Sequence, residues 1–334
     1  MSSSAQAAIT VDPAVLEHPS DEDYATSGYD TSTASLTNSI REYAFENGRR
    51  YHTYFGADKN PLPTDETEQD RLDVHHEVFL ILLDRKLHRA PIGKSPNRIL
   101  DVGTGTGIWA IDMADKYPSA EVIGVDLSPI QPGWVPPNCR FELDDAELDW
   151  TFRPDYFDFI HIRNLSQAVT KWEKVLSEAY RCTIPGGYIE LAELGGVAHS
   201  DDGSMSPDNG VKVFLSLLDS GLRKMGRVAS ATGESLRANL EDAGFVDIDI
   251  FTCKQPLAPW AHDKKLKQVG AVALLSAPTG FHAYGMAVFT RVLGMDPEEA
   301  DMVCKRATAA VMNKNNHIYT YFYVVHGQKP TEKE

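Results

Sequence analysis

The stretch Asp101-Val102-Gly103-Thr104-Gly105-Thr106-Gly107 lies between an apolar run that predicts a strand and a segment that predicts a helix. Glycines in such a turn let the backbone bend sharply and approach a ligand without a Cβ in the way. The next predicted strand ends at Asp126, about 20 residues further on, where a carboxylate is placed to accept hydrogen bonds from both hydroxyls of a ribose. Because strand, turn, helix, strand and acid occur in this order, we expect a nucleoside-containing ligand at the turn.

Short apolar runs alternate with helical segments along the chain around this turn. Buried strands that alternate with crossover helices are typical of a parallel sheet covered on both faces. We therefore predict an α/β fold with a doubly wound, mostly parallel, seven-stranded sheet. The predicted helices are 107–116, 171–182, 206–223 and 232–243, and the predicted strands are 99–102, 122–125, 140–143, 157–162, 188–191, 246–252 and 318–325.

The remaining residues predict three further parts. Residues 1–38 are acidic and rich in Ser and Thr, which indicates a flexible tail that either solubilises the protein or folds over a ligand. Residues 39–95 predict a helical lid with one helix over 39–54 and another from near Asp65 to about Leu87. We expect the Asp65 carboxylate to cap the start of the second helix, with Glu68 capping in return. The sheet domain, 96–334, contains a mostly helical insert over about 253–317 that we expect to cover a substrate.

Composition excludes several classes of protein. With 32 Lys and Arg against 48 Asp and Glu, the net charge is −16, which argues against a nucleic-acid partner. The four cysteines lie more than 40 residues apart, without metal-ligand or redox spacing, and indicate a reducing compartment. We expect the protein in the cytoplasm, with the nucleus as the alternative. We expect no membrane partner, because the longest apolar run, 270–277, is too short to span a bilayer. We also expect no bound metal ion.

The spacing of the glycines distinguishes between ligands. A dinucleotide site needs a third glycine at position 108, where a helix N-terminus meets a pyrophosphate, but this chain has Ile108 there and Gly107 before it. That spacing, with Asp101 just before the turn, suits a ligand without phosphate, such as the sulfonium compound S-adenosylmethionine. A nicotinamide or flavin cofactor is the alternative.

With these motifs the chain resembles the class I S-adenosylmethionine-dependent methyltransferases, whose fold is Rossmann-like. The resemblance extends from about Glu46 to the end and includes Pro185-Gly186-Gly187 before the fifth strand and 240–245 before the sixth. It implies that Leu127 packs on adenine, that Asp145 accepts from the adenine amino group and that the N–H of Ala146 meets the ring. The cofactor-binding candidates are Tyr51, Asp101, Gly103, Thr104, Gly105, Asp126, Leu127, Asp145, Ala146, Arg163 and Asn164.

Three segments together, 46–52, 65–73 and 107–112, are similar to the fungal LaeA-like branch of this family. That branch contains regulators of secondary metabolism and pathway enzymes that methylate small products. The resemblance implies an O- or N-methyltransferase acting on a small secondary metabolite. The alternatives are a regulatory methyltransferase that works through protein partners and a protein or histone methyltransferase. The oligomeric state is left open.

Methyl transfer is an in-line displacement, and it needs a base when the attacking group is a hydroxyl or a protonated amine. Among the histidines, His161 and His282 are our candidates for this base, with His199 also considered and Tyr51 and His52 as lid groups. Trp260 and Tyr284 in the late insert are candidates to line the substrate pocket. For these residues ordinary core packing is the competing interpretation.

Overall fold

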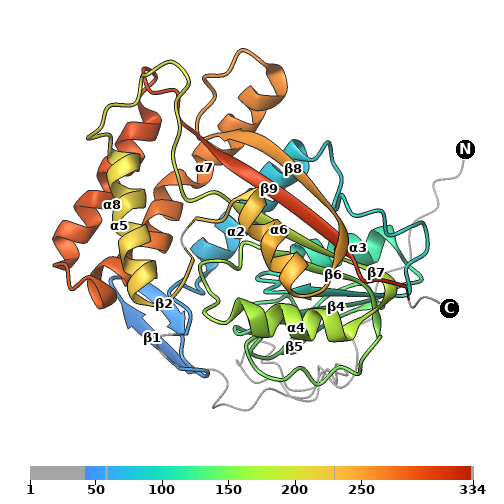
Figure 1. The fold of residues 1–334 in the computed structure, drawn as a ribbon. Coiled ribbons are helices and arrows are strands. Elements are labelled where there is room, and N and C mark those ends of the chain that lie inside the picture. Colours follow the sequence, from blue (N-terminus) through green and yellow to red (C-terminus); the bar gives the residue numbers. More distant parts are fainter. Residues whose placement is uncertain (1–41, 57–58, 229, 332–334) are drawn as a thin grey trace, which may run out of the picture. The chain divides into compact units, whose positions relative to one another are not determined.

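The protein was analysed as a computed structural model, which describes residues 42–56, 59–228 and 230–331; the predicted tail lies outside them. In this part of the chain the main sheet has seven strands in the order β5-β4-β3-β6-β7-β9-β8 (Figure 1). Strands β3 to β7 pair in parallel, and β9 is antiparallel to both β7 and β8. The predicted doubly wound sheet is therefore confirmed. The strands are β3 (Arg98–Val102), β4 (Glu121–Asp126), β5 (Cys139–Leu143), β6 (Phe157–Arg163), β7 (Thr183–Leu194), β8 (Val246–Pro256) and β9 (Tyr319–Gln328).

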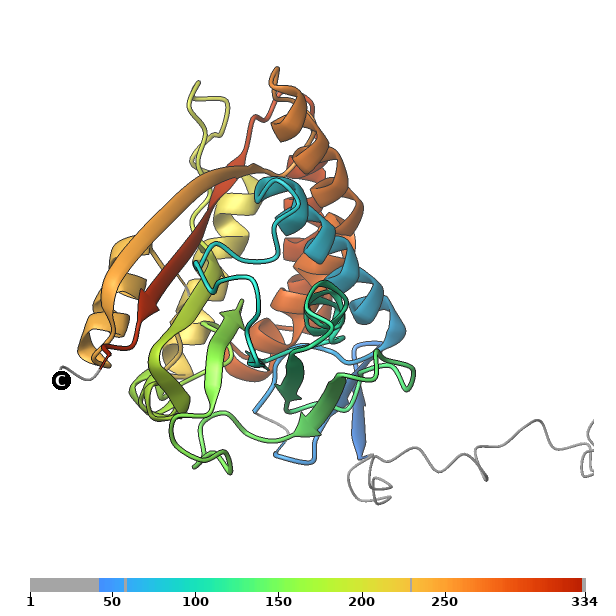
Figure 2. The ribbon, with the colours of Figure 1, turned by 90° about the vertical axis from the view of Figure 1, so that its right-hand side faces the viewer.

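Helices cover both faces of the sheet. Successive strand residues point to opposite faces, so each face presents apolar side chains that pack against helices. On β3, Ile99 packs with Trp109 of α3 (Ile108–Lys116), whereas Leu100 packs with Leu176 of α4 (Trp172–Cys182). The α4 face also carries α6 (Gly233–Asp242). The opposite face is covered by α3 together with α2 (Glu66–Leu82) and α7 (Lys264–Ala287), and the last two lie side by side (Figure 2).

Four helical segments build a second core beside the sheet. They are α5 (Gly210–Lys224), the end of α7, the π-helical turn η2 (Val288–Val292) and α8 (Pro297–Met312). Phe214, Phe289 and Cys304 are buried at its centre. The predicted insert is thus helical, although β8 extends through its first residues to Pro256, and α5 joins it from an earlier part of the chain.

The N-terminal segment differs from the predicted helix. Residues Tyr43–Glu46 and Arg49–His52 form the antiparallel hairpin β1-β2. Its two turn residues, Asn47 and Gly48, both have positive φ, 50° and 74°. Asn-Gly is the preferred pair for a two-residue hairpin turn of this kind, so the turn chemistry overrides the helical pattern.

Helix α2 begins as predicted, with the Asp65 side chain accepting from the backbone N–H of Glu68 at 3.0 Å. The Glu68 carboxylate accepts from the Arg71 guanidinium at 2.7 and 2.9 Å instead of serving as a return cap. The helix ends at Leu82, earlier than predicted, because Asp84 and Arg85 adopt left-handed φ values of 54° and 64°.

The continuous helix Lys264–Val292 is long and apolar enough to span a membrane by length and composition alone. The apolar run 270–277, on which the sequence prediction was based, is only a part of this helix. A core helix of a soluble protein passes the same test. This helix contacts α2, α5, α8 and β8, and 39% of its most apolar window is buried.

Gly270 and Gly280 of α7 provide a stability test. A Cβ at Gly270 would lie 2.0 Å from the carbonyl oxygen of Ala258, whereas at Gly280 its nearest neighbour would be Arg71 Cδ at 3.6 Å. We expect Gly270→Ala to lower the free energy of unfolding by about 1–3 kcal/mol because backbone cannot move aside. Gly280→Ala should be neutral or raise it by up to about 1 kcal/mol, because alanine favours helix. Chemical denaturation measures both, and equal stability of the two variants would contradict the argument.

Candidate functional site

The glycine turn after β3 is held against the end of β4. The backbone N–H groups of Gly103 and Thr104 both donate to the carbonyl of Val125, at 2.8 and 3.0 Å. Gly103 has φ 72°, and a Cβ there would lie 2.7 Å from a methyl group of Leu165. The turn therefore requires glycine for its conformation and for its close packing.

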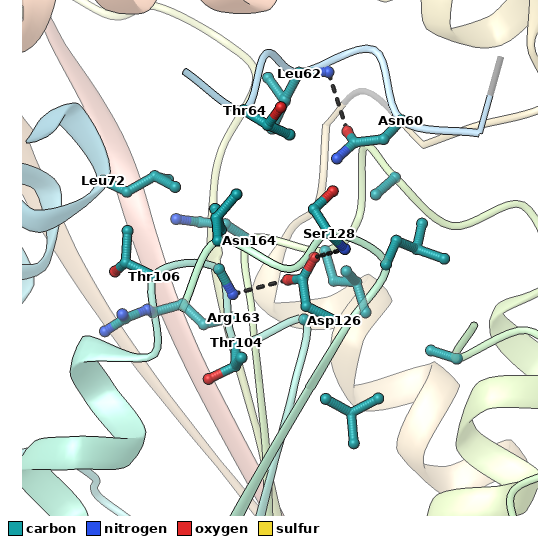
Figure 3. A pocket seen from close by; sticks show the side chains of 18 of the residues that line it. Asn60, Leu62, Thr64, Leu72, Thr104, Thr106, Asp126, Ser128, Arg163 and Asn164 are labelled. Carbon is teal, nitrogen blue, oxygen red and sulfur yellow. Dashed lines mark hydrogen bonds between the residues drawn. The ribbon is translucent and has the colours of Figure 1, made fainter. Parts of the chain in front are cut away.

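Asp126, at the carboxyl end of β4, connects the turn with the next loop. Its Oδ2 accepts from the N–H of Gly105 at 2.8 Å, and its Oδ1 accepts from the N–H of Ser128 at 2.9 Å (Figure 3). Burial raises the pKa of Asp126 to about 6, although these hydrogen bonds act in the opposite direction. The buried hydroxyl of Ser128 has no hydrogen-bond partner among the described residues, which leaves a polar atom for a ligand.

A cavity, here called the glycine-turn pocket, opens over these groups (Figure 3). Its walls come from the carboxyl ends of β3, β4 and β6, from helix α2 and from the segment before it. Parallel strands present their carboxyl ends at one edge of the sheet, where such folds bind ligands. The pocket brings together the predicted residues Gly103, Thr104, Gly105, Asp126, Leu127, Asp145, Ala146, Arg163 and Asn164.

Two predicted cofactor residues do not line this pocket. Asp101 is buried behind the turn, where Oδ2 accepts from the Thr104 hydroxyl at 2.6 Å and Oδ1 lies 2.7 Å from Nδ1 of His161. In this arrangement its carboxylate orients the hydroxyl of Thr104, which lines the pocket. Tyr51 is buried in the hairpin, with the Arg291 guanidinium 4.4 Å from its ring centre.

The carboxylate of Asp145 already has two partners. Oδ2 lies 2.6 Å from Nζ of Lys59, and Oδ1 accepts from the N–H of Glu147 at 2.9 Å. Lys59 also pairs with Glu147 at 3.0 Å, which ties the segment before α2 to the loop after β5. Contact between Asp145 and an adenine amino group stays a prediction, and in this geometry Lys59 would share that carboxylate.

Arg163 and Asn164 form the wall at the end of β6. Nη1 of Arg163 lies 3.1 Å from Nδ1 of His76, and its guanidinium lies 5.1 Å from the ring centre of Phe79. Burial lowers the pKa of Arg163 to about 10, so it remains a cation at neutral pH. Asn164 has a left-handed φ of 53° and turns the chain at the edge of the pocket.

A second cavity, here called the apolar pocket, adjoins the first. His75 of α2, Asn164 after β6 and Tyr284 of α7 line both cavities. Aliphatic and aromatic side chains of α5 and α7 form much of the wall of the apolar pocket, and Glu193, Gln255 and Thr320 add polar groups. Such a mainly apolar cavity with a few polar groups is typical of a small-molecule site.

Sequence reasoning missed His75 and Glu193. His75 lies in α2 and Glu193 in β7, and both side chains are buried. A buried ionisable residue is uncommon and is itself a signal for a functional site. Burial, followed by the charges of Arg71 and Arg163, lowers the pKa of His75 well below its ordinary value, so its imidazole is neutral.

The predicted catalytic histidines lie elsewhere. His161 is buried between sheet and helix, stacked on Trp109 with ring centres 3.7 Å apart, and lines neither pocket. His282 lies in a groove beside the hairpin, 3.5 Å from the Arg49 guanidinium. His199 pairs with Tyr319 in an isolated β-bridge and lines neither pocket.

Of the two predicted substrate residues, Tyr284 lines both pockets. Trp260 lines neither and donates its indole N–H to the carbonyl of Ile318 at 3.2 Å. Among the described residues, no group of three or more His, Cys, Asp or Glu side chains is placed to hold a metal ion.

The sequence profile of a methyltransferase-domain family matches residues 74–250. The methyltransferase pytC of Aspergillus terreus is 38% identical over 302 residues, covering 90% of this chain and 92% of that protein. The chain belongs to the class I S-adenosylmethionine-dependent methyltransferases. It lies in the LaeA-like branch: the secondary metabolism regulator LAE1 of Cochliobolus heterostrophus is 35% identical, with 86% of this chain and 95% of LAE1 covered.

The chain is also similar to a second fungal protein and to a solved methyltransferase structure. The protein-methionine methyltransferase laeA of Emericella nidulans is 33% identical, with 85% of this chain and 76% of that protein covered. Among solved structures, a phosphoethanolamine N-methyltransferase of Haemonchus contortus with S-adenosylhomocysteine bound is 19% identical, with a TM-score of 0.46. That match covers 76% of this methyltransferase and 52% of the solved chain.

The glycine-turn pocket of this methyltransferase fits S-adenosylmethionine. The glycine turn leaves the backbone open, the Asp126 carboxylate is in place for a ribose diol, and the buried Ser128 hydroxyl lacks a partner among the described residues. When bound, the cofactor supplies an electrophilic methyl group. The chain itself supplies the donors and acceptors that fix its orientation.

Asp126→Asn tests the ribose contact. Loss of a charged acceptor should weaken S-adenosylhomocysteine binding about 10- to 100-fold, as expected for one or two charge-assisted hydrogen bonds. Titration calorimetry measures the dissociation constant. Asp158→Asn is the control, because Asp158 also accepts a backbone N–H, from Arg98 at 2.9 Å, but lies outside the pocket. Unchanged affinity in Asp126→Asn would exclude the contact.

The raised pKa of Asp126 predicts how binding depends on pH. Below about pH 6 the free carboxyl is protonated and can no longer accept two hydroxyl donors, so affinity for S-adenosylhomocysteine should fall as pH is lowered from 7 to 5. The same titration on Asp126→Asn should be flat over this range. A wild-type affinity that does not change between pH 7 and 5 would contradict the assignment.

Proposed function

We propose that this methyltransferase transfers the methyl group of S-adenosylmethionine to an oxygen or nitrogen of a small, largely apolar secondary metabolite bound in the apolar pocket. One observation carries the proposal: His75, Asn164 and Tyr284 line both cavities, so a molecule in the apolar pocket lies next to the cofactor. An in-line displacement needs such adjacency, because the rate depends on the two reacting atoms being held close together.

The chemistry of the pocket supports this acceptor class. Its wall includes Phe214, Leu218 and Phe281 from the second core, which favour an apolar molecule. The cover predicted from the late insert agrees with this arrangement, because α7 supplies part of the wall. The similarity to pytC, itself named a methyltransferase, and to regulators of secondary metabolism agrees with a role in that metabolism.

A regulatory or protein-methylating role is the competing proposal, and the names of LAE1 and laeA support it. The geometry favours a small acceptor. The aromatic ring of Tyr284 lies under the Arg71 guanidinium, 5.0 Å away, and both groups belong to the wall of the apolar pocket. A protein acceptor would have to insert a side chain into a cavity whose wall includes the buried Arg71.

The test is incubation of the purified full chain with methyl-labelled S-adenosylmethionine and a fungal metabolite extract, followed by mass spectrometry. We expect label in a small molecule, and we expect it to be lost with Asp126→Asn. In a parallel reaction a protein lysate replaces the extract. Label only in protein would support the competing role, and no label in either reaction would overturn the assignment of an acceptor to this pocket.

A further inference from the structure

Glu193 lines the apolar pocket close to Asn164, which lines both cavities. It is the second-last residue of β7, and its Oε1 accepts from the N–H groups of Leu165 and Ser166 at 2.8 and 3.1 Å. These two residues directly follow Asn164, whose Oδ1 accepts from the N–H of Leu194 at 3.3 Å. Two backbone N–H groups therefore hold the carboxylate beside Asn164, which lines both cavities.

The surroundings of Glu193 favour a proton acceptor. The other titratable groups that line the apolar pocket are Arg71, His75 and Tyr284. Arg71 is a cation paired with Glu68, and burial raises the pKa of the Tyr284 phenol, which therefore keeps its proton at neutral pH. Burial lowers the pKa of His75 well below its ordinary value, so its neutral imidazole is a weaker proton acceptor than a carboxylate whose pKa is raised. Burial also raises the pKa of Glu193 to about 7, against its backbone hydrogen bonds. A base with a pKa near the working pH is the most effective.

Two unpaired polar atoms mark a second point of recognition in the apolar pocket. The side-chain oxygens Oε1 of Gln255 and Oγ1 of Thr320 are buried and have no hydrogen-bond partner within the described residues. The two residues are register partners on β8 and β9, so they lie side by side. Buried polar atoms without partners are rare, and a bound molecule that pairs with them relieves the cost of burial.

We propose that Glu193 is the general base of the reaction and that the acceptor is a largely apolar molecule with two polar groups. One group is the hydroxyl that becomes methylated, and the other hydrogen-bonds to Gln255 and Thr320. A lone pair of the acceptor oxygen forms the bond to the methyl carbon while the carbon–sulfur bond breaks and its electrons go to sulfur. The hydroxyl proton goes to the Glu193 carboxylate. This inference rests on the proposed function and names its base and acceptor class.

Glu190 of the same strand provides a matched control. Its carboxylate is equally buried and accepts two backbone N–H groups, from Arg89 and Ala90, both at 2.7 Å. Burial raises its pKa to about 7 as well. Glu190 lines neither pocket. Comparing Glu193→Gln with Glu190→Gln therefore separates catalysis from the general effect of changing a buried carboxylate.

The experiment measures initial rates of labelled methyl transfer to the dilute fungal extract, at saturating S-adenosylmethionine, between pH 5.5 and 8.5. For the wild type and Glu190→Gln we expect rates that rise about tenfold per pH unit and level off above about pH 7, because Glu193 must be ionised. For Glu193→Gln we expect a rate about 100-fold lower at pH 8 and no inflection near 7. The product should be a methyl ether.

Two binding measurements accompany the rates. S-adenosylhomocysteine affinity by calorimetry should be the same in Glu193→Gln and the wild type, since the amide oxygen can still accept from Leu165 and Ser166. Infrared difference spectra, wild type minus Glu193→Gln, should show a protonated carboxyl band that disappears as pH rises through about 7. Thr320→Val should lower the rate on dilute extract about three- to tenfold without moving the inflection, because it removes only one recognition contact.

The outcomes separate the two proposals. No labelled small molecule with the wild type would overturn the proposed function and this inference with it. Wild-type transfer combined with an undiminished rate, or an unchanged inflection, in Glu193→Gln would overturn the inference alone. Methylation at nitrogen or carbon would overturn the assigned hydroxyl acceptor.

Discussion

The structure of the site depends on the carboxylate of Asp126, which binds the N–H of Gly105 on one side and the N–H of Ser128 on the other. These two bonds hold the glycine turn and the loop after β4 in one place. The turn also holds Thr104 against Asp101, and Leu165, from the loop after β6, packs against Gly103. The turn and the loop after β4 are therefore held in place before a ligand binds, and the ligand does not need to displace these backbone hydrogen bonds.

The sheet could be predicted because its signals are local. Each strand is a short apolar run, and its alternation with helices identifies a parallel sheet without knowledge of any distant contact. The N-terminal hairpin was wrongly predicted as a helix because a helical pattern was preferred to the two-residue turn signal Asn47-Gly48. The shortened end of α2 depends on left-handed residues, Asp84 and Arg85, which no periodicity reveals.

The candidate site also has a part that local sequence signals predict and a part that depends on tertiary packing. The glycine turn, Asp126 and the residues that follow β5 and β6 lie at strand ends, and their positions follow from the topology. The walls of the apolar pocket come from α2, α5, α7, β8 and β9, which only tertiary packing brings together. For that reason Tyr284 was found by its aromatic character, whereas Glu193 and His75 became visible only with the cavity. His161 resembles a site residue in sequence, yet its partners Asp101 and Trp109 make it part of the core.

The shared wall has a thermodynamic consequence. His75, Asn164 and Tyr284 belong to both cavities, so a shift of any of them on binding one molecule changes the space and polarity offered to the other. Such coupling is reciprocal: the factor by which cofactor alters acceptor affinity equals the factor by which acceptor alters cofactor affinity. The demethylated cofactor carries no positive charge on sulfur, so the two forms of the cofactor need not couple equally to an acceptor. His75, Asn164 and Tyr284 are the side chains through which such coupling would pass, because they line both cavities.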